Sequence, residues 1–183
     1  MASRPKALLI HICVLLLSLM AVVSLHAQKE KRDPLTSAQV EKIREAGIDP
    51  AERVKIYTKI VDEHVVTIKG LTNRSKSTAR SHRLDEELQD LTALMDELGS
   101  NLDVYADRHA DIRISLKPLA EATPGWLTAI KALPGESGFD LARKEAIESG
   151  QDLADQAERL LREQTEYFNL HKDERGQERA EPK

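Results

Sequence analysis

The chain has 183 residues and a formal net charge of −4, with 32% charged and 3% aromatic residues. A mildly acidic chain has no electrostatic reason to bind nucleic acid, which argues against a nucleic-acid partner. The single cysteine, Cys13, lies inside an N-terminal apolar run, so the rest of the chain has no thiol for a disulfide, a nucleophile or a metal site. Sparse glycine and aromatic residues, with abundant Ala, Leu and Glu, favour an all-α fold over a β-sandwich.

The first 27 residues are typical of a secretory signal peptide. Arg4 and Lys6 form a basic start, the run 7–25 is apolar apart from His11 and two serines, and Ala27 provides a small residue at the cleavage position. We therefore expect export to the periplasm or out of the cell, with cleavage after Ala27. The apolar run is nearly long enough to cross a bilayer, so an uncleaved inner-membrane anchor formed by residues 7–25 is the alternative.

Charged segments flank the expected helical bundle domain, which spans residues 35–170. Residues 28–34 form a charged stretch that we expect to be a disordered leader. Residues 171–183 are also charged and almost free of apolar side chains, so we expect a disordered tail. The length between them is usual for one domain with a single core.

The first two helices have strong start signals. Thr36 can cap a short helix while Gln39 reaches back to it, which is the capping-box arrangement, and Gly47 ends that helix. Asp49 then caps a second helix that has Pro50 in its first turn. We expect the second helix to run from Pro50 to about Leu71. Its apolar-side positions lie on one face and are Val54, Tyr57, Val61, His64, Ile68 and Leu71.

After a Ser- and Thr-rich loop over residues 73–81, the third segment has the most regular pattern of the chain. Its apolar-side positions alternate in steps of four and three, with acidic residues between them on the outer faces. The pattern predicts one long helix with a bend at Pro118, which lacks an N–H. The expected buried positions are Leu84, Leu88, Leu91, Met95, Leu98, Leu102, Tyr105, His109, Ile112, Leu116 and Leu119.

The C-terminal part predicts one short helix and one long helix. Thr123 and Pro124 form a cap-and-proline start, Trp126 is expected to plug one end of the bundle, and Pro134 stops the short helix. The last helix is expected over residues 139–170, and small residues in its first half allow a neighbouring helix to approach closely. Its expected buried positions are Ala146, Gly150, Leu153, Ala157, Leu160, Gln164 and Tyr167.

None of these amphipathic helices is stable alone, so they must bury their apolar stripes together. The short link between the second and third helices makes them antiparallel neighbours. We therefore predict an up-down-up bundle of three long helices with two short accessory helices. The stripes are expected to pack within one chain rather than as a coiled coil between chains.

Two histidines on the apolar stripes are candidates for metal binding. If the link between the second and third helices turns near Ser77, His64 lies beside Asp90, whereas His109 lies about 28 Å further along. The chain contains no Glu-x-x-His for a di-iron site and no Cys-x-x-Cys-His for haem. We therefore predict half-buried structural histidines and no metal site. The alternative is a metal or small-ligand carrier that uses His64 with Asp90.

Asp103, Asp107 and Asp111 follow one another at four-residue spacing, which places them on one helical face. Such a set could bridge a divalent cation, but Ca²⁺ usually takes six or more oxygen ligands from a curved loop. We therefore expect a solvated acidic face.

Five basic residues surround the Ser-rich loop, namely Lys69, Arg74, Lys76, Arg80 and Arg83. Anionic lipid headgroups are one candidate partner for this cluster. Favourable interaction with a helix end is the other explanation, and it accounts for Lys69 and Arg74. The same loop holds a glycosylation sequon at Asn73, which is relevant only in a eukaryotic secretory pathway.

A catalytic function has no support in the sequence. The serines lie in expected loops and caps without a Gly-rich elbow, and no Ser or Thr stands beside a base with an orienting acid. We therefore expect no enzyme, no catalytic residue, no cofactor-binding residue and no bound metal.

The segment Leu35-Thr36-Ser37-Ala38-Gln39 resembles the Leu-Thr-x-x-Gln motif of the Spy/CpxP-like periplasmic chaperones. That family usually carries the motif twice, whereas the chain has one copy. The resemblance implies a small, exported, helical and cofactor-free protein that binds unfolded envelope proteins.

Over most of its length the chain also resembles a group of uncharacterised exported all-helical bacterial proteins. The features that suggest this are the acidic third helix, the stretch 121–134 and Glu163-Gln164 before Tyr167-Phe168. This resemblance implies a bacterial extracytoplasmic location and no particular activity.

These observations together predict a non-enzymatic interaction or structural module outside the cytoplasm. Its expected partner is another envelope protein or a second copy of the chain, and contact with a membrane is expected only through an uncleaved signal segment. The alternatives are a chaperone-like binder and a metal or small-ligand carrier.

Overall fold

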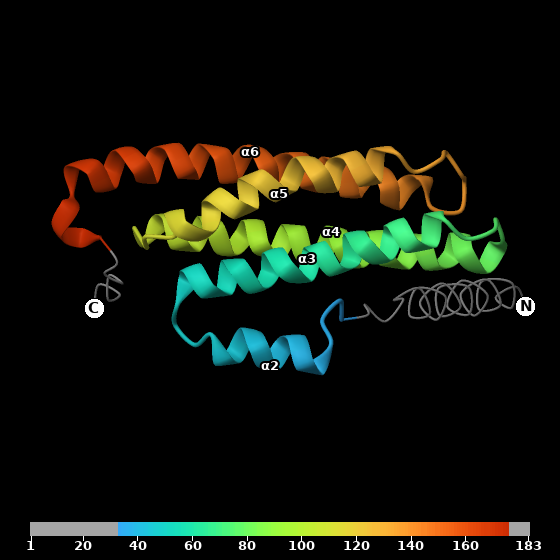
Figure 1. Cartoon of the computed structure of the whole chain (residues 1–183), viewed down its shortest axis with the longest axis horizontal. Coiled ribbons are helices and arrows are strands. Elements are labelled where there is room, and N and C mark those ends of the chain that lie inside the picture. Colours follow the sequence, from blue (N-terminus) through green and yellow to red (C-terminus); the bar gives the residue numbers. More distant parts are fainter. Residues whose placement is uncertain (1–32, 176–183) are drawn as a thin grey trace, which may run out of the picture. The chain divides into compact units, whose positions relative to one another are not determined.

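The computed structural model describes residues 33–175, and all regular structure within this part is helical (Figure 1). The all-α prediction is therefore confirmed. The expected signal peptide, residues 1–27, lies outside the described residues. The same holds for most of the expected leader and for residues 176–183 of the expected tail.

Helix α2 spans Ser37–Glu45 and begins with the predicted capping box. The Thr36 hydroxyl accepts a hydrogen bond from the Gln39 N–H, while the Gln39 side chain accepts one from the Thr36 N–H. After the helix, Gly47 has a φ of 59°, which a residue with a side chain rarely adopts. The chain thereby reverses into the next helix within a few residues.

Helix α3 spans Pro50–Thr72, with Asp49 accepting hydrogen bonds from the N–H groups of Ala51 and Glu52. Its predicted stripe is buried except for the half-buried His64. The following loop covers only residues 73–77, because Ser77 caps the next helix by accepting from the Arg80 N–H. The loop is therefore shorter than the predicted one over residues 73–81.

The predicted long third helix is wrong, because the structure divides it into α4, Thr78–Asp107, and α5, Arg113–Lys131. His109 closes α4 in the left-handed conformation, with a φ of 51°. The N–H of Ala110 then donates to the carbonyl of Tyr105, and the N–H of His109 donates to that of Ala106. This is a Schellman motif with histidine where glycine is usual, so no glycine marked the end of the helix.

Helix α5 runs through both Pro118 and Pro124. The chain therefore stays helical past Pro118, as expected, whereas the predicted helix start at Thr123 is wrong. Pro124 has no N–H for the carbonyl of Ala120. The Thr123 hydroxyl donates to that carbonyl at 3.3 Å instead, which keeps it partnered within the helix.

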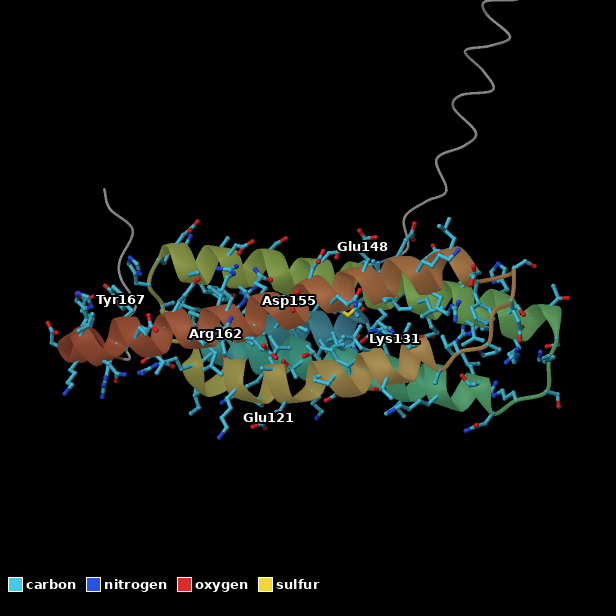
Figure 2. The ribbon with its side chains drawn as sticks, turned by 90° about the horizontal axis from the view of Figure 1, so that it is seen from above. Glu121, Lys131, Glu148, Asp155, Arg162 and Tyr167 are labelled. Carbon is cyan, nitrogen blue, oxygen red and sulfur yellow. The ribbon has the colours of Figure 1, made fainter. Side chains whose placement is uncertain are left out.

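Helix α6 spans Asp140–Leu170, close to the predicted range, and a 3-10 turn, η1, follows at Lys172–Glu174. The first residues of the expected tail therefore form a turn. Close approach through small residues is confirmed at Gly150, where a Cβ would lie 3.1 Å from Leu127 Cδ2. Exposed charged residues at seven-residue spacing, Glu148, Asp155 and Arg162, line the outer side of α6 (Figure 2).

The four long helices enclose one core, in which α3 and α6 each pack against both α4 and α5 (Figure 1). Helices α3 and α4 are antiparallel as predicted, because Tyr57 bonds to Glu97, whereas His64, further along α3, contacts Glu87, which comes earlier in α4. Helices α4 and α5 follow each other in the chain but lie across the core from one another. The structure therefore differs from the expected three-helix arrangement, since α5 is a fourth long helix.

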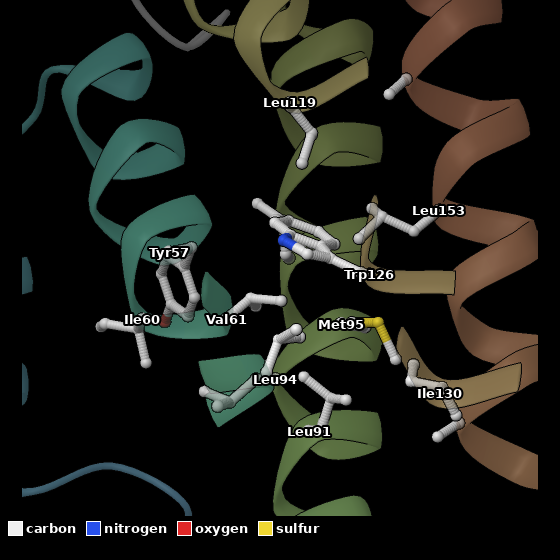
Figure 3. Close-up of a cluster of buried hydrophobic side chains, with 14 of the residues drawn as sticks. Tyr57, Ile60, Val61, Leu91, Leu94, Met95, Leu119, Trp126, Ile130 and Leu153 are labelled. Carbon is white, nitrogen blue, oxygen red and sulfur yellow. The ribbon is translucent and has the colours of Figure 1, made fainter. Parts of the chain in front are cut away.

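Trp126 lies in the middle of the bundle and not at its end, which corrects the expected position. Its ring is surrounded by side chains such as Val61, Met95 and Leu153, which come from the central turns of the other three long helices (Figure 3). The indole N–H donates to the carboxylate of Asp62 on α3. The largest buried residue of α5 thus ties that helix to α3 by packing and by a hydrogen bond.

Candidate interaction surface

A groove of about 410 Å³ lies between α2 and α3. It exists because α2 is short and has contacts with α3 alone among the helices, with Ile43 as its only buried residue. The groove is lined by Gln39, Lys42, Glu45, Ala46, Glu52, Ile56, Lys59, Ile60 and Glu63. The turn at Gly47 brings these residues of two successive helices together.

The groove has an apolar floor and a charged rim. Ile60 is buried and Ile56 is half-buried against the core, so together with Ala46 they form the floor. Two glutamates on the rim have partners: Glu63 accepts a hydrogen bond from Gln39 Nε2 at 3.2 Å, and Glu52 accepts one from Lys55 Nζ at 3.0 Å. Lys42 forms no ion pair with the described residues, so at least one cation on the rim is available to a bound molecule.

His64 is half-buried on α3 and contacts a carboxylate of α4. His64 Nδ1 lies 3.0 Å from Glu87 Oε2, and Arg83 approaches the other oxygen of that carboxylate at 3.3 Å. Asp90, the predicted neighbour of His64, is buried on the same helix as Glu87.

His109 is exposed, which contradicts the prediction that it lies half-buried on the apolar stripe. Its ring stacks on Tyr167 with centroids 4.5 Å apart, and His171 stacks on Tyr167 at 4.2 Å. The Tyr167 hydroxyl donates to Glu174, which holds the 3-10 turn against the end of α6. These rings therefore serve as packing at one end of the bundle.

The three aspartates predicted to share a helical face do not share one, because α4 ends at Asp107. Asp103 accepts a hydrogen bond from Gln156 on α6, at 2.6 Å. Asp111 lies in the α4–α5 turn and accepts two hydrogen bonds from the guanidinium of Arg113. Residues 33–175 hold no group of three His, Cys, Asp or Glu side chains placed to bind a metal ion.

The predicted basic cluster divides into buried and exposed members. Arg80 is buried, and its terminal nitrogen donates to both carboxylate oxygens of Glu136 at 2.6 and 2.8 Å. Hydrogen bonds from Arg80 lower the pKa of Glu136 below its ordinary value. Lys69 and Arg74 are exposed, as is Asn73 of the sequon. The α5–α6 loop is thus fixed to the first turn of α4.

Sequence reasoning did not find the role of Gln164, although it placed this residue on the buried stripe of the last helix. Its side-chain N–H donates to the carbonyl of Ala110 at 2.9 Å, and its oxygen accepts from the N–H of Ile112 at 3.1 Å. The signal was the presence of an amide on an otherwise apolar stripe. The side chain clamps the α4–α5 turn onto α6.

Tyr57 forms a second polar contact between helices, with its hydroxyl donating to Glu97 on α4. Burial, followed by the hydrogen bond to Glu97, raises the pKa of Tyr57 above its ordinary value. The phenol therefore stays protonated and holds α3 to α4.

No protein-family model, curated protein or solved structure matches the chain. Within residues 33–175, no helix has the length and apolar character needed to span a membrane.

Proposed function

We propose that the bundle is a non-enzymatic interaction module of the cell envelope that binds a short amphipathic helix of a partner protein in the α2–α3 groove. The observation that carries this proposal is the apolar floor of the groove between rims of both charge signs. The signal-peptide pattern of residues 1–27 supports the location outside the cytoplasm.

The dimensions and mobility of the groove fit such a partner. Its volume of about 410 Å³ lies within the usual range for binding pockets. Because Ile43 is the only buried residue of α2, this helix can shift on α3 without opening the four-helix core. A partner helix would place an apolar stripe on Ile56 and Ala46, with acidic side chains toward Lys42 and Lys59.

A chaperone-like activity is the second candidate function. Gln39, the last residue of the Leu-Thr-x-x-Gln motif, lines the groove and contacts Glu63. An unfolded chain offers the same apolar and charged groups as an amphipathic helix, but without fixed spacing. Protection of a reduced, unfolded model protein from aggregation at an equimolar ratio would favour this function.

The test is titration calorimetry of the full chain with a synthetic amphipathic Leu/Lys/Glu helix about four turns long. We expect saturable binding that weakens about tenfold in Ile56→Gln, since an amide then replaces part of the apolar floor. Ile114→Gln is the matched control, because Ile114 is 70% exposed on α5 and away from the groove. Absence of saturable binding, or equal weakening in both variants, refutes the proposal, as does catalytic turnover of a substrate by the purified protein.

A further inference from the structure

The two lysines that line the α2–α3 groove stand on opposite walls at nearly the same level. Lys42 belongs to α2 and Lys59 to α3, and the two helices run in opposite directions. The hydrogen bond between Gln39 and Glu63 fixes which residues face each other. Lys42 comes three residues after Gln39, and Lys59 comes four residues before Glu63. The positions of the two lysines therefore differ by one residue, or about 1.5 Å along a helix.

The carboxylates of the groove lie on either side of this level. Glu63 lines the groove toward one end, and Glu45 and Glu52 line it toward the other, near the turn into α3. Glu63 accepts a hydrogen bond from Gln39, and Glu52 accepts one from Lys55. Positive charge is thus confined to the middle of the groove, with negative charge toward both ends.

The two lysines have no acidic partner of their own. Both are exposed, and neither forms an ion pair with another residue of the part 33–175. Like charges on facing walls repel each other, so this level of the groove favours an anionic group. The apolar floor continues beside them, because Ile60 is buried and lies next to Lys59 in the sequence. A ligand that fits this level must therefore combine an apolar surface with carboxylates.

We propose that the partner helix carries two acidic residues two positions apart, one on each flank of its apolar stripe, and that their carboxylates pair with Lys42 and Lys59. This inference rests on the function proposed above and names the feature by which the groove selects its partner. Residues two positions apart lie about 200° apart around a helix and about 3 Å apart along it, so they reach both walls at one level. The negative ends of the groove repel the same carboxylates, which fixes the position of the partner helix along the groove.

The experiment compares three synthetic peptides by titration calorimetry with the full chain. The peptides share one amphipathic sequence about four turns long and differ only at two central flanking positions, which are both Glu, both Gln or both Lys. These three residues have similar helix propensities, so a difference in affinity reports charge. Each exposed ion pair strengthens binding up to about fivefold. We expect the Glu peptide to bind about fivefold or more tightly than the Gln peptide and the Lys peptide to bind most weakly. Salt at about 1 M should remove this order.

A double charge reversal tests whether the two lysines cause the preference. In Lys42→Glu/Lys59→Glu the order should invert, so that the Lys peptide binds most tightly. Lys117→Glu/Lys131→Glu is the matched control, since it changes the net charge equally at exposed positions of α5, which has no contact with α2. Equal affinity for the three peptides, or the same change of order in both double variants, overturns this inference but leaves the groove as a binding site. Failure of all three peptides to bind overturns the proposed function as well.

Two other occupants of the groove give different results. A fatty acid also combines a carboxylate with an apolar surface, so decanoate is added to the complex with the Glu peptide at an equal concentration. A second copy of the chain is tested by sedimentation without peptide. Displacement of the peptide by decanoate, or a dimer that no longer binds the peptide, overturns the proposal.

Discussion

Replacing Gln164 with methionine removes both hydrogen bonds to the α4–α5 turn while keeping nearly the same side-chain length. Gln164 is 6% exposed, so water cannot easily take over its contacts with the carbonyl of Ala110 and the N–H of Ile112. Each buried backbone group left without a partner costs about 1–3 kcal/mol. The more apolar side chain returns part of this, so we expect a loss of about 2–4 kcal/mol in the free energy of unfolding.

Urea unfolding followed by far-ultraviolet circular dichroism measures this loss as a lower midpoint with an unchanged slope. The matched control is Gln156→Met on the same helix, where the half-buried amide bonds to Gly99 and Asp103. Water can replace those bonds, so we expect a loss of less than about 1 kcal/mol. A Gln164→Met variant that unfolds within about 0.5 kcal/mol of the native chain would refute the clamp.

Three further changes test other contacts of the fold. Folding lowers the pKa of Glu136, so its contribution to stability is present at neutral pH and is lost as pH falls through the ordinary carboxyl value of 4.5 and below. Glu136→Gln should flatten this part of a plot of unfolding free energy against pH, and an unchanged slope contradicts the ion pair with Arg80. Trp126→Phe should cost about 1–3 kcal/mol in denaturant unfolding, because the hydrogen bond to Asp62 and part of the core packing disappear; no loss would mean that the indole is not fixed there. His109→Val should lower the thermal midpoint more than His109→Asn, since a β-branched residue resists the left-handed conformation that asparagine tolerates, and equal effects would exclude that conformation.

The sequence predicted the helices best where local chemistry decides the structure. Thr36 and Asp49 cap helices by bonds within three residues, so their roles follow from neighbours in the chain. The spacing of apolar residues also identified most of the core, because a helix must turn such a stripe inward to bury it. The range of α6 followed from the same signal.

The prediction of one long third helix was wrong because the spacing of apolar residues does not mark where a helix ends. Ile112 continues the apolar spacing of α4 across a turn, so the pattern alone does not reveal the break. The break depends on His109 in a conformation that costs energy locally and on Gln164, which lies far away in the chain. A local conformational cost that is offset by a distant residue leaves no recognisable pattern in the neighbouring sequence.

The candidate interaction surface was beyond sequence reasoning for a related reason. Ile60 belongs to a row of α3 next to the predicted stripe, and only the position of α2 makes it the floor of a groove. Lys42 and Lys59 alternate with acidic residues in the sequence and look like any solvated helix face. Their meeting across the groove follows from the tight reversal at Gly47.

The dependence of the α4–α5 turn on Gln164 has a consequence for the order in which the protein assembles. Helices α3 and α4 are linked by five residues and can pair early, whereas α5 lies across the core from α4 and needs α6 to complete its surroundings. The closing contact lies near the end of α6, the last long helix of the bundle. A nascent chain therefore cannot complete the bundle until α6 has been synthesised, and any process that requires an unfolded substrate can act until then.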